Sequence, residues 1–464
     1  MTDRSSTNPL IVSTLATAVQ WTNQVLSFGV LWYAARALPL ASFGMVTISL
    51  SLYSLLHVAT NFGSTRDIVP RVASHQRIGR RVVTGTFSRR FTVSAPLALL
   101  VVLVSLILRL PSTDATVYVI MAAAAVFYAF DSQPFLDGLG RVDRGVLVGL
   151  LRHLTLAATA FIIFFSDSLP DRLAIAIGYL IGSVTATILG LLLLHRTARS
   201  SDRSKAAPEA PAWTELFPLA LSAFCVQIYY SADVLIIGAI TGKPAAGIYS
   251  AAYKLMSFFL IIGLSYQRAH FPLLPEILTG DRLLRHLRNS SRVLGRVLAP
   301  VIVFGCLEAS RVMAFIWGES FTGGGLYLVW LLPNVLLAGF SGLVGNIHLT
   351  LGNRGHYLKT VSIAAGLNVA ANLLLIPLAG PLAAAWSTLL AEFTVLALFL
   401  RPLQLDWQLL LRPLLPSIVT ALTVGALSLL LPVRLHTLIT LALDCTLYVL
   451  LLVAVRTLRA RRRT

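Results

Sequence analysis

The sequence predicts an all-α integral membrane protein with about 14 transmembrane helices. Apolar residues make up 56% of the 464-residue chain, charged residues only 12%, and the mean hydropathy is +0.80. A soluble domain usually carries about twice as much charge. Apolar runs long enough to cross a bilayer recur along the whole chain, and the basic residues between them are strongly biased to one side. Together these observations exclude a soluble globular protein.

Fourteen apolar runs have the length of a spanning helix, which is roughly 20 residues at ~1.5 Å rise per residue. The runs cover residues 10–34, 43–63, 91–110, 115–136, 145–165, 172–194, 216–240, 247–271, 296–317, 326–350, 358–377, 381–400, 409–431 and 436–455. Two of the longest polar segments between these runs, 64–90 and 272–295, have amphipathic spacing. They are expected to form helices that lie along the inner membrane surface. None of the polar segments is long enough for a soluble catalytic domain.

The formal net charge of +18 supports this topology. With the N-terminus placed in the cytoplasm, 28 of the 37 lysines and arginines fall on inner segments and five on outer segments. This bias predicts that both termini are cytoplasmic, and it indicates anionic lipid head groups, not nucleic acid, as the partner of the charge. The other four basic residues lie within predicted spans: Arg152, Lys254, Arg268 and Arg311.

A polar linker rich in Ser, Ala and Pro divides the chain into two similar halves. Val19-Gln20, Pro39 and Gly44 recur in the same order as Val226-Gln227, Pro244 and Gly247. Because each half has six spans, both have the same orientation, and a pseudo-two-fold axis along the membrane normal would relate them around a central cavity. The expected parts are an N-terminal six-helix half (1–194), a cytoplasmic linker (195–215), a C-terminal six-helix half (216–400), and two additional helices with a basic tail (401–464).

The hairpin of residues 227–255 carries a carboxylate, Asp233, and an ammonium, Lys254. Their distances from the turn at Gly242 place both ~12–15 Å below one membrane face. An ionisable group at that depth is expensive and usually faces a cavity or an opposite charge. Two interpretations remain: a substrate or coupling-ion site, or an ion pair that only joins two helices.

Polar residues follow one face of each of the first two spans. The first span has Ser13, Thr17, Gln20, Gln24 and Ser27 at steps of three or four residues, and the second has a similar stripe that ends in His57 and Asn61. Such stripes either line a hydrated cavity or hydrogen-bond neighbouring helices. His57 is a candidate proton site because imidazole titrates near neutral pH; a satisfied hydrogen bond inside the bundle is the alternative.

Motifs of catalysis are missing from the sequence. It has no Walker-type phosphate loop, no His/Cys/Asp cluster with metal-ligand spacing and no Gly-x-Ser-x-Gly elbow. The three cysteines, Cys225, Cys306 and Cys445, lie in separate apolar runs and are expected to be small core residues. The chain is therefore not expected to be an enzyme or to hold a metal or cofactor.

Several segments resemble the polysaccharide-biosynthesis (O-antigen) flippase family, Wzx-type, of the multidrug/oligosaccharidyl-lipid/polysaccharide exporter superfamily. They are residues 230–238 (YSADVLIIG), 246–255 (AGIYSAAYKL), 34–38 with 42–44, and 63–66. The resemblance covers nearly the whole chain. It implies a 6+6 helical repeat with a V-shaped central cavity and alternating access. It also implies translocation of an undecaprenyl-pyrophosphate-linked oligosaccharide repeat unit across the bacterial cytoplasmic (inner) membrane, for surface polysaccharide biosynthesis.

Two related branches share this fold and remain as alternatives: lipid II flippases and ion-coupled multidrug/cation antiporters. The resemblance implies a lipid-linked oligosaccharide and membrane lipids as partners, leaves polysaccharide polymerases as candidate partners, and fits a monomer. No cofactor is expected, and a proton or sodium gradient is the candidate driving force.

The expected cavity has cations for the pyrophosphate and polar side chains for the sugars. The cations are Lys254, Arg268, Arg152 and Arg36; the sugar contacts are Gln20, Gln24, Gln227, Tyr229 and Tyr230. Asp233 is expected to pair with Lys254 in the resting state. His57 and Asp233 are the candidates for ion coupling.

Overall fold

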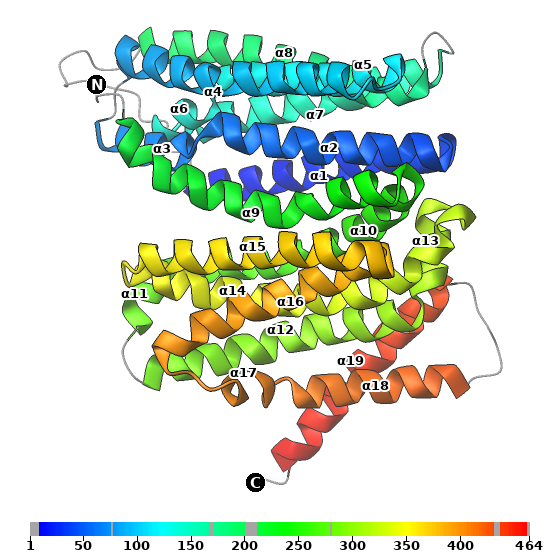
Figure 1. Ribbon diagram of the computed structural model, residues 1–464. Helices are drawn as coiled ribbons and strands as arrows, with labels where there is room; N and C mark the ends of the chain where they lie inside the picture. Colours follow the sequence, from blue (N-terminus) through cyan, green and yellow to red (C-terminus); the bar gives the residue numbers. More distant parts are fainter. Residues whose placement is uncertain are drawn as a thin grey trace. The chain divides into compact units, whose positions relative to one another are not determined.

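The computed structural model describes residues 9–75, 78–166, 170–199, 211–278, 281–430 and 437–461. These residues form helices joined by short turns and contain no strand (Figure 1). Eleven of the described helices are long and apolar enough to cross a membrane. Three further predicted spans coincide with α1 (Pro9–Ala37), α18 (Leu415–Leu430) and α19 (Thr437–Arg461). The all-helical membrane fold is therefore confirmed, whereas the count of 14 spans is not.

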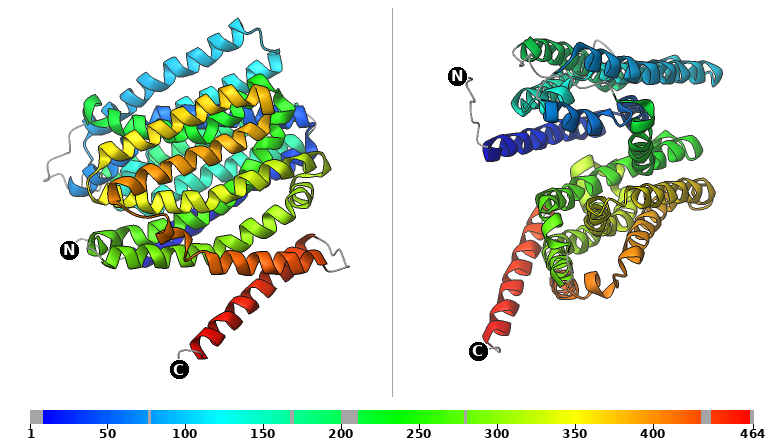
Figure 2. Two further views of the ribbon diagram at one scale, coloured as in Figure 1. Left: turned by 60° about the horizontal axis from the view of Figure 1, so that its bottom comes forward. Right: turned by 90° about the vertical axis from the view of Figure 1, so that its left-hand side faces the viewer.

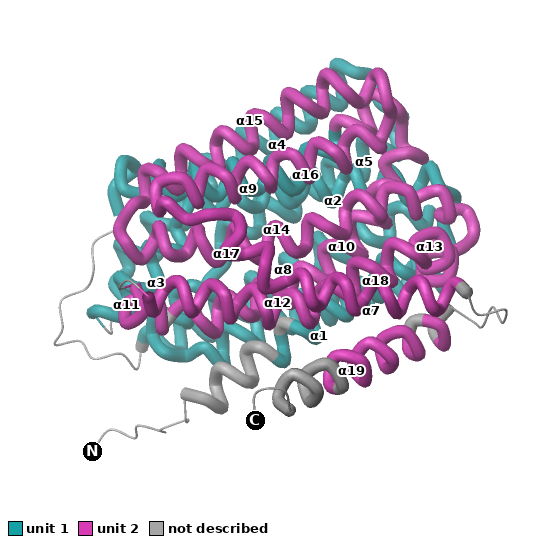
Figure 3. Tube along the Cα trace, turned by 90° about the horizontal axis from the view of Figure 1, so that it is seen from below, with its two compact units in different colours: residues 1–235 teal, residues 236–464 magenta. Residues whose placement is uncertain are grey.

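The chain divides into two compact units, Met1–Leu235 and Ile236–Thr464, which Figure 3 colours separately. We call them unit 1 and unit 2. Residues 200–210, the middle of the predicted linker 195–215, lie outside the described residues. The predicted division into two six-helix halves and two additional helices stays a prediction.

Unit 1 is a bundle in which α7 packs against α1 and α8, and α5 packs against α2, α4 and α8. Its elements after α1 are α2 (Leu40–Asn61), α3 (Ser64–His75), α4 (Arg80–Ile107), α5 (Ser112–Phe127), η1 (Tyr128–Phe130), α6 (Gln133–Gly138), α7 (Val142–Phe164), α8 (Asp171–Arg199) and the first part of α9 (Trp213–Ile240).

Close backbone contact between α7 and α8 depends on a glycine pair one helical turn apart. A Cβ on Gly178 would lie 2.8 Å from the carbonyl oxygen of Leu156, and a Cβ on Gly182 would lie 2.6 Å from that of Arg152. Helices in lipid gain most of their association energy from such close packing, because lipid tails are as apolar as the side chains. This seam fixes the part of α7 that carries Arg152.

The spanning helix that starts with α5 is broken in its middle. It passes from α5 through η1 to an extended residue, Asp131 (ψ 119°), before α6 resumes the helix. Pro134 favours the break, because it has no amide hydrogen to donate to the carbonyl of Phe130 and, near the start of α6, it lies where a helix tolerates proline. The carbonyl groups freed by the break need other donors, because lipid supplies none.

Unit 2 is centred on α14, which packs against α10, α12 and α16, while α15 packs on α16. α18 lies along α12 and α19 packs on α18, at the edge of the unit (Figure 2). The elements are α10 (Lys243–His270), η2 (Phe271–Leu273), α11 (Leu274–Ile277), α12 (Asp281–Leu307), α13 (Ala309–Trp317), η3 (Glu319–Gly324), α14 (Gly325–Thr350), α15 (Arg354–Ala379), α16 (Pro381–Leu400), η4 (Arg401–Leu403) and α17 (Gln408–Leu411), followed by α18 and α19.

Candidate functional site

A buried polar cluster surrounds the break in unit 1. Arg90 of α4 is only 1% exposed. Its Nη1 donates to the carbonyl oxygen of Asp131 at 2.9 Å, and its Nε donates to the hydroxyl of Ser64 at 2.7 Å. A weaker contact at 3.4 Å joins its Nη2 to the side-chain oxygen of Asn61. The guanidinium thus supplies a donor to a carbonyl at the helix break.

A second arginine reaches the same break from α7. The Nη2 of Arg152 lies 3.3 Å from a carboxylate oxygen of Asp131, which is 3% exposed. The guanidinium carbon of Arg152 also lies 5.0 Å from the centre of the Tyr128 ring, which is a cation–π distance. Asp131 therefore binds Arg90 through its backbone carbonyl and Arg152 through its buried side chain.

His57 joins this cluster through aromatic contacts. Its ring centre lies 3.7 Å from that of Tyr128 and 6.0 Å from that of Tyr53. The imidazole is half-buried and forms no hydrogen bond among the described residues. The structure therefore brings two predicted site residues, His57 and Arg152, to one tyrosine, Tyr128.

Four predicted site residues lie on α9. Asp233 is 1% exposed, and Tyr229 is 6% exposed and makes an edge contact with Tyr230 at 5.1 Å between ring centres. The amide of Gln227 donates to the hydroxyl of Ser231 at 2.6 Å, so part of its hydrogen-bonding capacity is used within the helix. The carboxylate predicted at membrane depth is indeed a buried one.

Lys254 and Arg268 lie on α10, and both are exposed. Lys254 is the twelfth residue of the 28-residue helix, so it is ~17 Å from its start. Among the described residues Lys254 forms no hydrogen bond or ion pair. An accessible ammonium in the middle of a spanning helix is available to a ligand. The pairing of Lys254 with Asp233 stays a prediction.

Three predicted site residues lie on α1. Gln24 is exposed, and Arg36 is exposed in the last turn with its guanidinium 4.8 Å from the centre of the Trp32 ring. The side chain of Gln20 lies outside the described residues. Of the predicted set, the structure therefore groups His57 with Arg152, and the four α9 residues with one another.

The sequence analysis missed Arg90, because it assigned residues 64–90 to an inner polar segment. The helix α4 begins at Arg80 instead of residue 91, which places Arg90 ~15 Å inside it. The polar pair Asn61 and Ser64, also in the cluster, could have signalled a partner for it. In unit 2, Glu308 and Arg311, three residues apart, form an ion pair with an Nη1–Oε2 distance of 3.0 Å.

Unit 2 has its own buried polar contacts. The hydroxyl of Ser341 on α14 donates to the carboxylate of Glu392 on α16 and so links these two helices. Asn368 and Asn372, both fully buried on α15, are joined within that helix by a hydrogen bond of 3.2 Å.

An ion network at the edge of unit 1 fixes α3 to α9. Arg71 binds Asp67 at 2.8 Å and Glu215 at 2.7 Å. Hydrogen bonding to Asp67, together with both negative charges, raises the pKa of Arg71 above its ordinary value. α3 is the amphipathic helix predicted within residues 64–90. It ends at His75, and α4 begins at Arg80.

The family model for polysaccharide biosynthesis proteins matches residues 13–278. The chain belongs to that family. The match includes all of unit 1 from the second turn of α1 onward, and it includes α9 and α10 with the predicted residues Asp233 and Lys254. No curated protein sequence matches the chain.

Solved transporter structures share the fold. A structure described as lipid II flippase MurJ in an inward closed conformation superposes with a TM-score of 0.70 at 12% identity, covering 94% of this chain and 97% of that one. An inward-facing multidrug resistance MATE family transporter of the MOP superfamily gives a TM-score of 0.63 at 13% identity, with 82% and 94% covered. A MOP superfamily transporter from Pyrococcus furiosus gives 0.56 at 13% identity, with 88% and 94% covered.

At these identities the likeness establishes a common fold. Together with the family match and the eleven apolar helices, it identifies the chain as a multi-pass membrane protein of the polysaccharide biosynthesis family that shares the fold of these transporters.

Proposed function

We propose that the protein moves a lipid-linked oligosaccharide, with an undecaprenyl-pyrophosphate carrier, from the inner to the outer leaflet of the bacterial cytoplasmic membrane. The observation that carries this proposal is the family match over residues 13–278, because the polysaccharide biosynthesis family needs a carrier for finished sugar units. The fold shared with lipid II flippase MurJ and with MATE transporters supports movement by alternating access between two halves.

In this mechanism the pyrophosphate meets a cation while the polyprenyl tail stays in lipid. Lys254 is the leading candidate, because its ammonium is exposed at mid-helix and has no partner among the described residues. Binding of a multiply charged phosphate group offsets the cost of holding a lysine at that depth. Arg36 and Arg268, which are also exposed, are further candidates. Arg152, already paired with Asp131, contributes through the arrangement of unit 1.

The test is a flipping assay in vesicles with a fluorescently labelled lipid-linked oligosaccharide. Lys254→Met keeps the side-chain length and removes the charge. We expect it to lower the initial rate at least ~10-fold, which corresponds to ~1.4 kcal/mol. Lys359→Met, at an exposed lysine in the second turn of α15, is the matched control and is expected to transport normally. Full activity of Lys254→Met would show that this ammonium does not bind the head group.

The same vesicles separate the proposed function from multidrug export. Efflux of a cationic dye without flipping of the lipid-linked sugar would overturn the proposal, and flipping of lipid II in preference to the oligosaccharide carrier would redirect it to the other branch. An imposed proton or sodium gradient tests the driving force. If His57 or Asp233 carries the coupled ion, His57→Gln or Asp233→Asn removes the response to the gradient and leaves downhill flipping intact.

Orientation and assembly are part of the proposal. Both termini lie in the cytoplasm, which a fluorescent protein fused to the C-terminus reports by its fluorescence. The protein works as a monomer beside a polysaccharide polymerase, and single-molecule bleaching of that fusion distinguishes one copy from two.

A further inference from the structure

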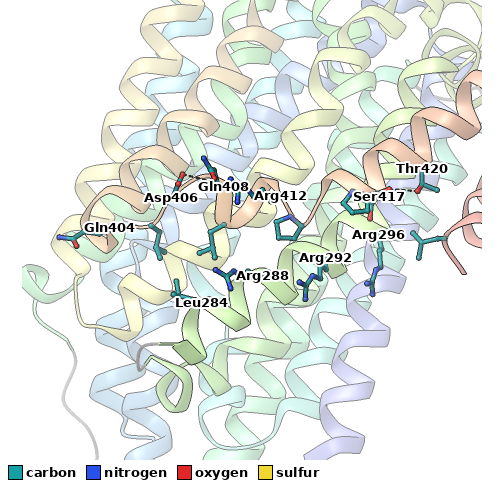
Figure 4. Close-up of a pocket in the computed structure, with 15 residues that line it drawn as sticks. Leu284, Arg288, Arg292, Arg296, Gln404, Asp406, Gln408, Arg412, Ser417 and Thr420 are labelled. Atoms are coloured by element: carbon teal, nitrogen blue, oxygen red, sulfur yellow. Dashed lines mark hydrogen bonds between the residues drawn. The ribbon is translucent and has the colours of Figure 1, made fainter. Parts of the chain in front are cut away.

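Unit 2 contains a basic pocket of about 720 Å³ between α12 and the segment of α17 and α18 (Figure 4). Four arginines line it: Arg288, Arg292 and Arg296 from α12, and Arg412 from the turn after α17. The three residues of α12 are spaced by four, so they form a row along one helix face with ~6 Å between neighbours. This row and Arg412 face the same space.

The pocket has little negative charge of its own. Asp406 is the only acidic residue among those that line it, and one of its carboxylate oxygens accepts a hydrogen bond of 3.0 Å from the backbone N–H of Gln408, at the start of α17. Arg292 donates to the side-chain oxygen of Asn289 at 3.0 Å. Arg288 and Arg412 are exposed and form no hydrogen bond or ion pair among the described residues. Two guanidinium groups are thus free for an anion.

An apolar groove of about 750 Å³ lies further along the same two helices. One helical turn beyond Arg296, α12 contributes Ala299 and Val303 to the groove. On α18, Ser417 lines the pocket and the next residue, Ile418, lines the groove. The opposite wall is formed by α14 and α16, with Trp330, Leu337, Trp386, Leu390 and Phe393. Along α12 the row of arginines is therefore followed, within about one helical turn, by the apolar residues of the groove.

We propose that this pocket and groove bind one anionic phospholipid of the surrounding bilayer, with its phosphate on the arginines and an acyl chain in the groove. Guanidinium groups suit a phosphate because they are planar, always charged and able to bind two oxygens at once. Basic pockets between transmembrane helices are a known way to hold phosphate head groups. A soluble phosphate would bind the basic pocket and leave the apolar groove empty. A zwitterionic lipid would fill the groove but bring its own cation close to the arginines. Neither ligand therefore fits both the pocket and the groove.

Trp330 and Trp386 supply a direct readout, because both line the groove and both are partly exposed, at 40% and 37%. A brominated acyl chain quenches tryptophan emission only on contact. The full-length protein is reconstituted in phosphatidylcholine vesicles containing a small fraction of brominated phosphatidylglycerol or brominated phosphatidylcholine, with no lipid-linked sugar present. We expect the anionic lipid to quench several-fold more at equal mole fraction. The double variant Trp330→Phe/Trp386→Phe should lose most of that difference.

Charge variants connect the preference to the pocket. Arg288→Gln/Arg292→Gln/Arg412→Gln should reduce quenching by the anionic lipid to the level of phosphatidylcholine. The matched control is Arg282→Gln/Arg285→Gln, at exposed arginines of the same helix that do not line the pocket, and it should keep the preference. Arg288→Gln alone, at an exposed side chain, should lose part of the preference and guards against misfolding of the triple variant.

Equal quenching by the two lipids in the parent protein would overturn the proposal, and so would an unchanged preference in the triple variant. Displacement of the brominated anionic lipid by millimolar inorganic phosphate would assign the pocket to a soluble anion instead. Val303→Phe, which narrows the groove without adding a charge or a tryptophan, should reduce quenching of Trp330 and Trp386 by the lipid in the groove. Because no sugar carrier is present, the result does not depend on the proposed flipping activity.

Discussion

Arg90→Met tests whether the broken helix of unit 1 is held by one buried guanidinium. Methionine has a similar length and fills the same apolar space, but it has no hydrogen-bond donor. In this variant the carbonyl oxygen of Asp131 loses its 2.9 Å donor and the hydroxyl of Ser64 loses its 2.7 Å partner. Water does not replace them, because Arg90 is 1% exposed.

The expected loss is about 2–4 kcal/mol. A hydrogen bond involving a charged group contributes roughly 1.5–3 kcal/mol in soluble proteins, whereas side-chain bonds in membrane proteins average only about 0.6 kcal/mol. The variant loses two short hydrogen bonds, each with a free energy between these limits. It also leaves the Asp131 carboxylate with only Arg152 as a nearby cation, and together these losses give the quoted range. At roughly 2–4 °C per kcal/mol for a unit of this size, the melting temperature should fall by about 5–15 °C.

Native cysteines allow unit 1 to be monitored by itself. Cys225 lies on α9 in unit 1, and Cys306 lies on α12 in unit 2. In a background carrying Cys306→Ala and Cys445→Ala, a thiol-reactive fluorescent dye reports the unfolding of unit 1 through Cys225. The matched control is Arg81→Met, at an exposed arginine of the same helix, which should melt within about 1 °C of the background.

Arg90→Lys separates charge from geometry. Lysine keeps the charge but is a single point donor, so it cannot serve Ser64 and Asp131 together in the way the guanidinium fork does. We therefore expect an intermediate loss. If Arg90→Met melts with Arg81→Met, the guanidinium does not stabilise the break and the reasoning fails. If Arg90→Lys melts like the background, the charge matters and the fork does not.

Three further predictions follow from the same contacts. Gly182→Ala should destabilise unit 1 by about 1–3 kcal/mol, because the new methyl group would lie 2.6 Å from the carbonyl oxygen of Arg152. As a control, Gly366→Ala should be neutral or slightly stabilising in thermal melts, because its methyl group would have no neighbour within 4 Å. Arg311→Ala should cost less than about 1 kcal/mol, because its ion pair joins it only to Glu308, the N-cap of its own helix, and its side chain is 41% exposed; a loss above ~2 kcal/mol would contradict this. The Arg71 network should contribute the same stability at every pH between roughly 6 and 9. A raised pKa of Arg71 means that its stabilisation is fully present below the ordinary guanidinium pKa and is lost only as the pH rises through the raised pKa. A stability difference between Arg71→Gln and the parent protein that varies over this range would argue against it.

Features that depend on neighbouring residues in the sequence were predictable. The turns at Gly242 and Gly380 separate α9 from α10 and α15 from α16, and both glycines have positive φ, 94° and 63°. Only glycine adopts such angles at little cost, and proline follows each turn closely, so composition alone places these helix ends. The Glu308–Arg311 pair was predictable for the same reason, since residues three apart share a helix face.

Contacts between distant residues were not predictable in this way. Arg90 meets Asp131 from 41 residues away, Arg152 meets it from 21 residues away, and Ser341 meets Glu392 from 51 residues away. Hydropathy and periodicity show that each of these residues lies on a helix, but they do not show which helices pack together. Asp131 therefore looked like a residue near the end of a span, although it lies at a break that two arginines stabilise.

The basic residues show most clearly what a charge count contains and what it leaves out. Arg71, Arg90, Arg288 and Arg412 were all counted alike, as charges between spans. In the structure Arg71 forms a partly exposed ion network, Arg90 is buried at a helix break, and Arg288 and Arg412 line a pocket without a side-chain hydrogen bond or ion pair among the described residues. Each of these arginines carries the same charge, but its effect on the free energy of folding depends on its solvation. The effect is small at the surface and large when the guanidinium is buried. A guanidinium that stays accessible in a pocket can instead bind a ligand. A bias of arginine to one side of the membrane therefore predicts orientation, and only the packing of helices decides which of those arginines also stabilises the fold or binds an anion.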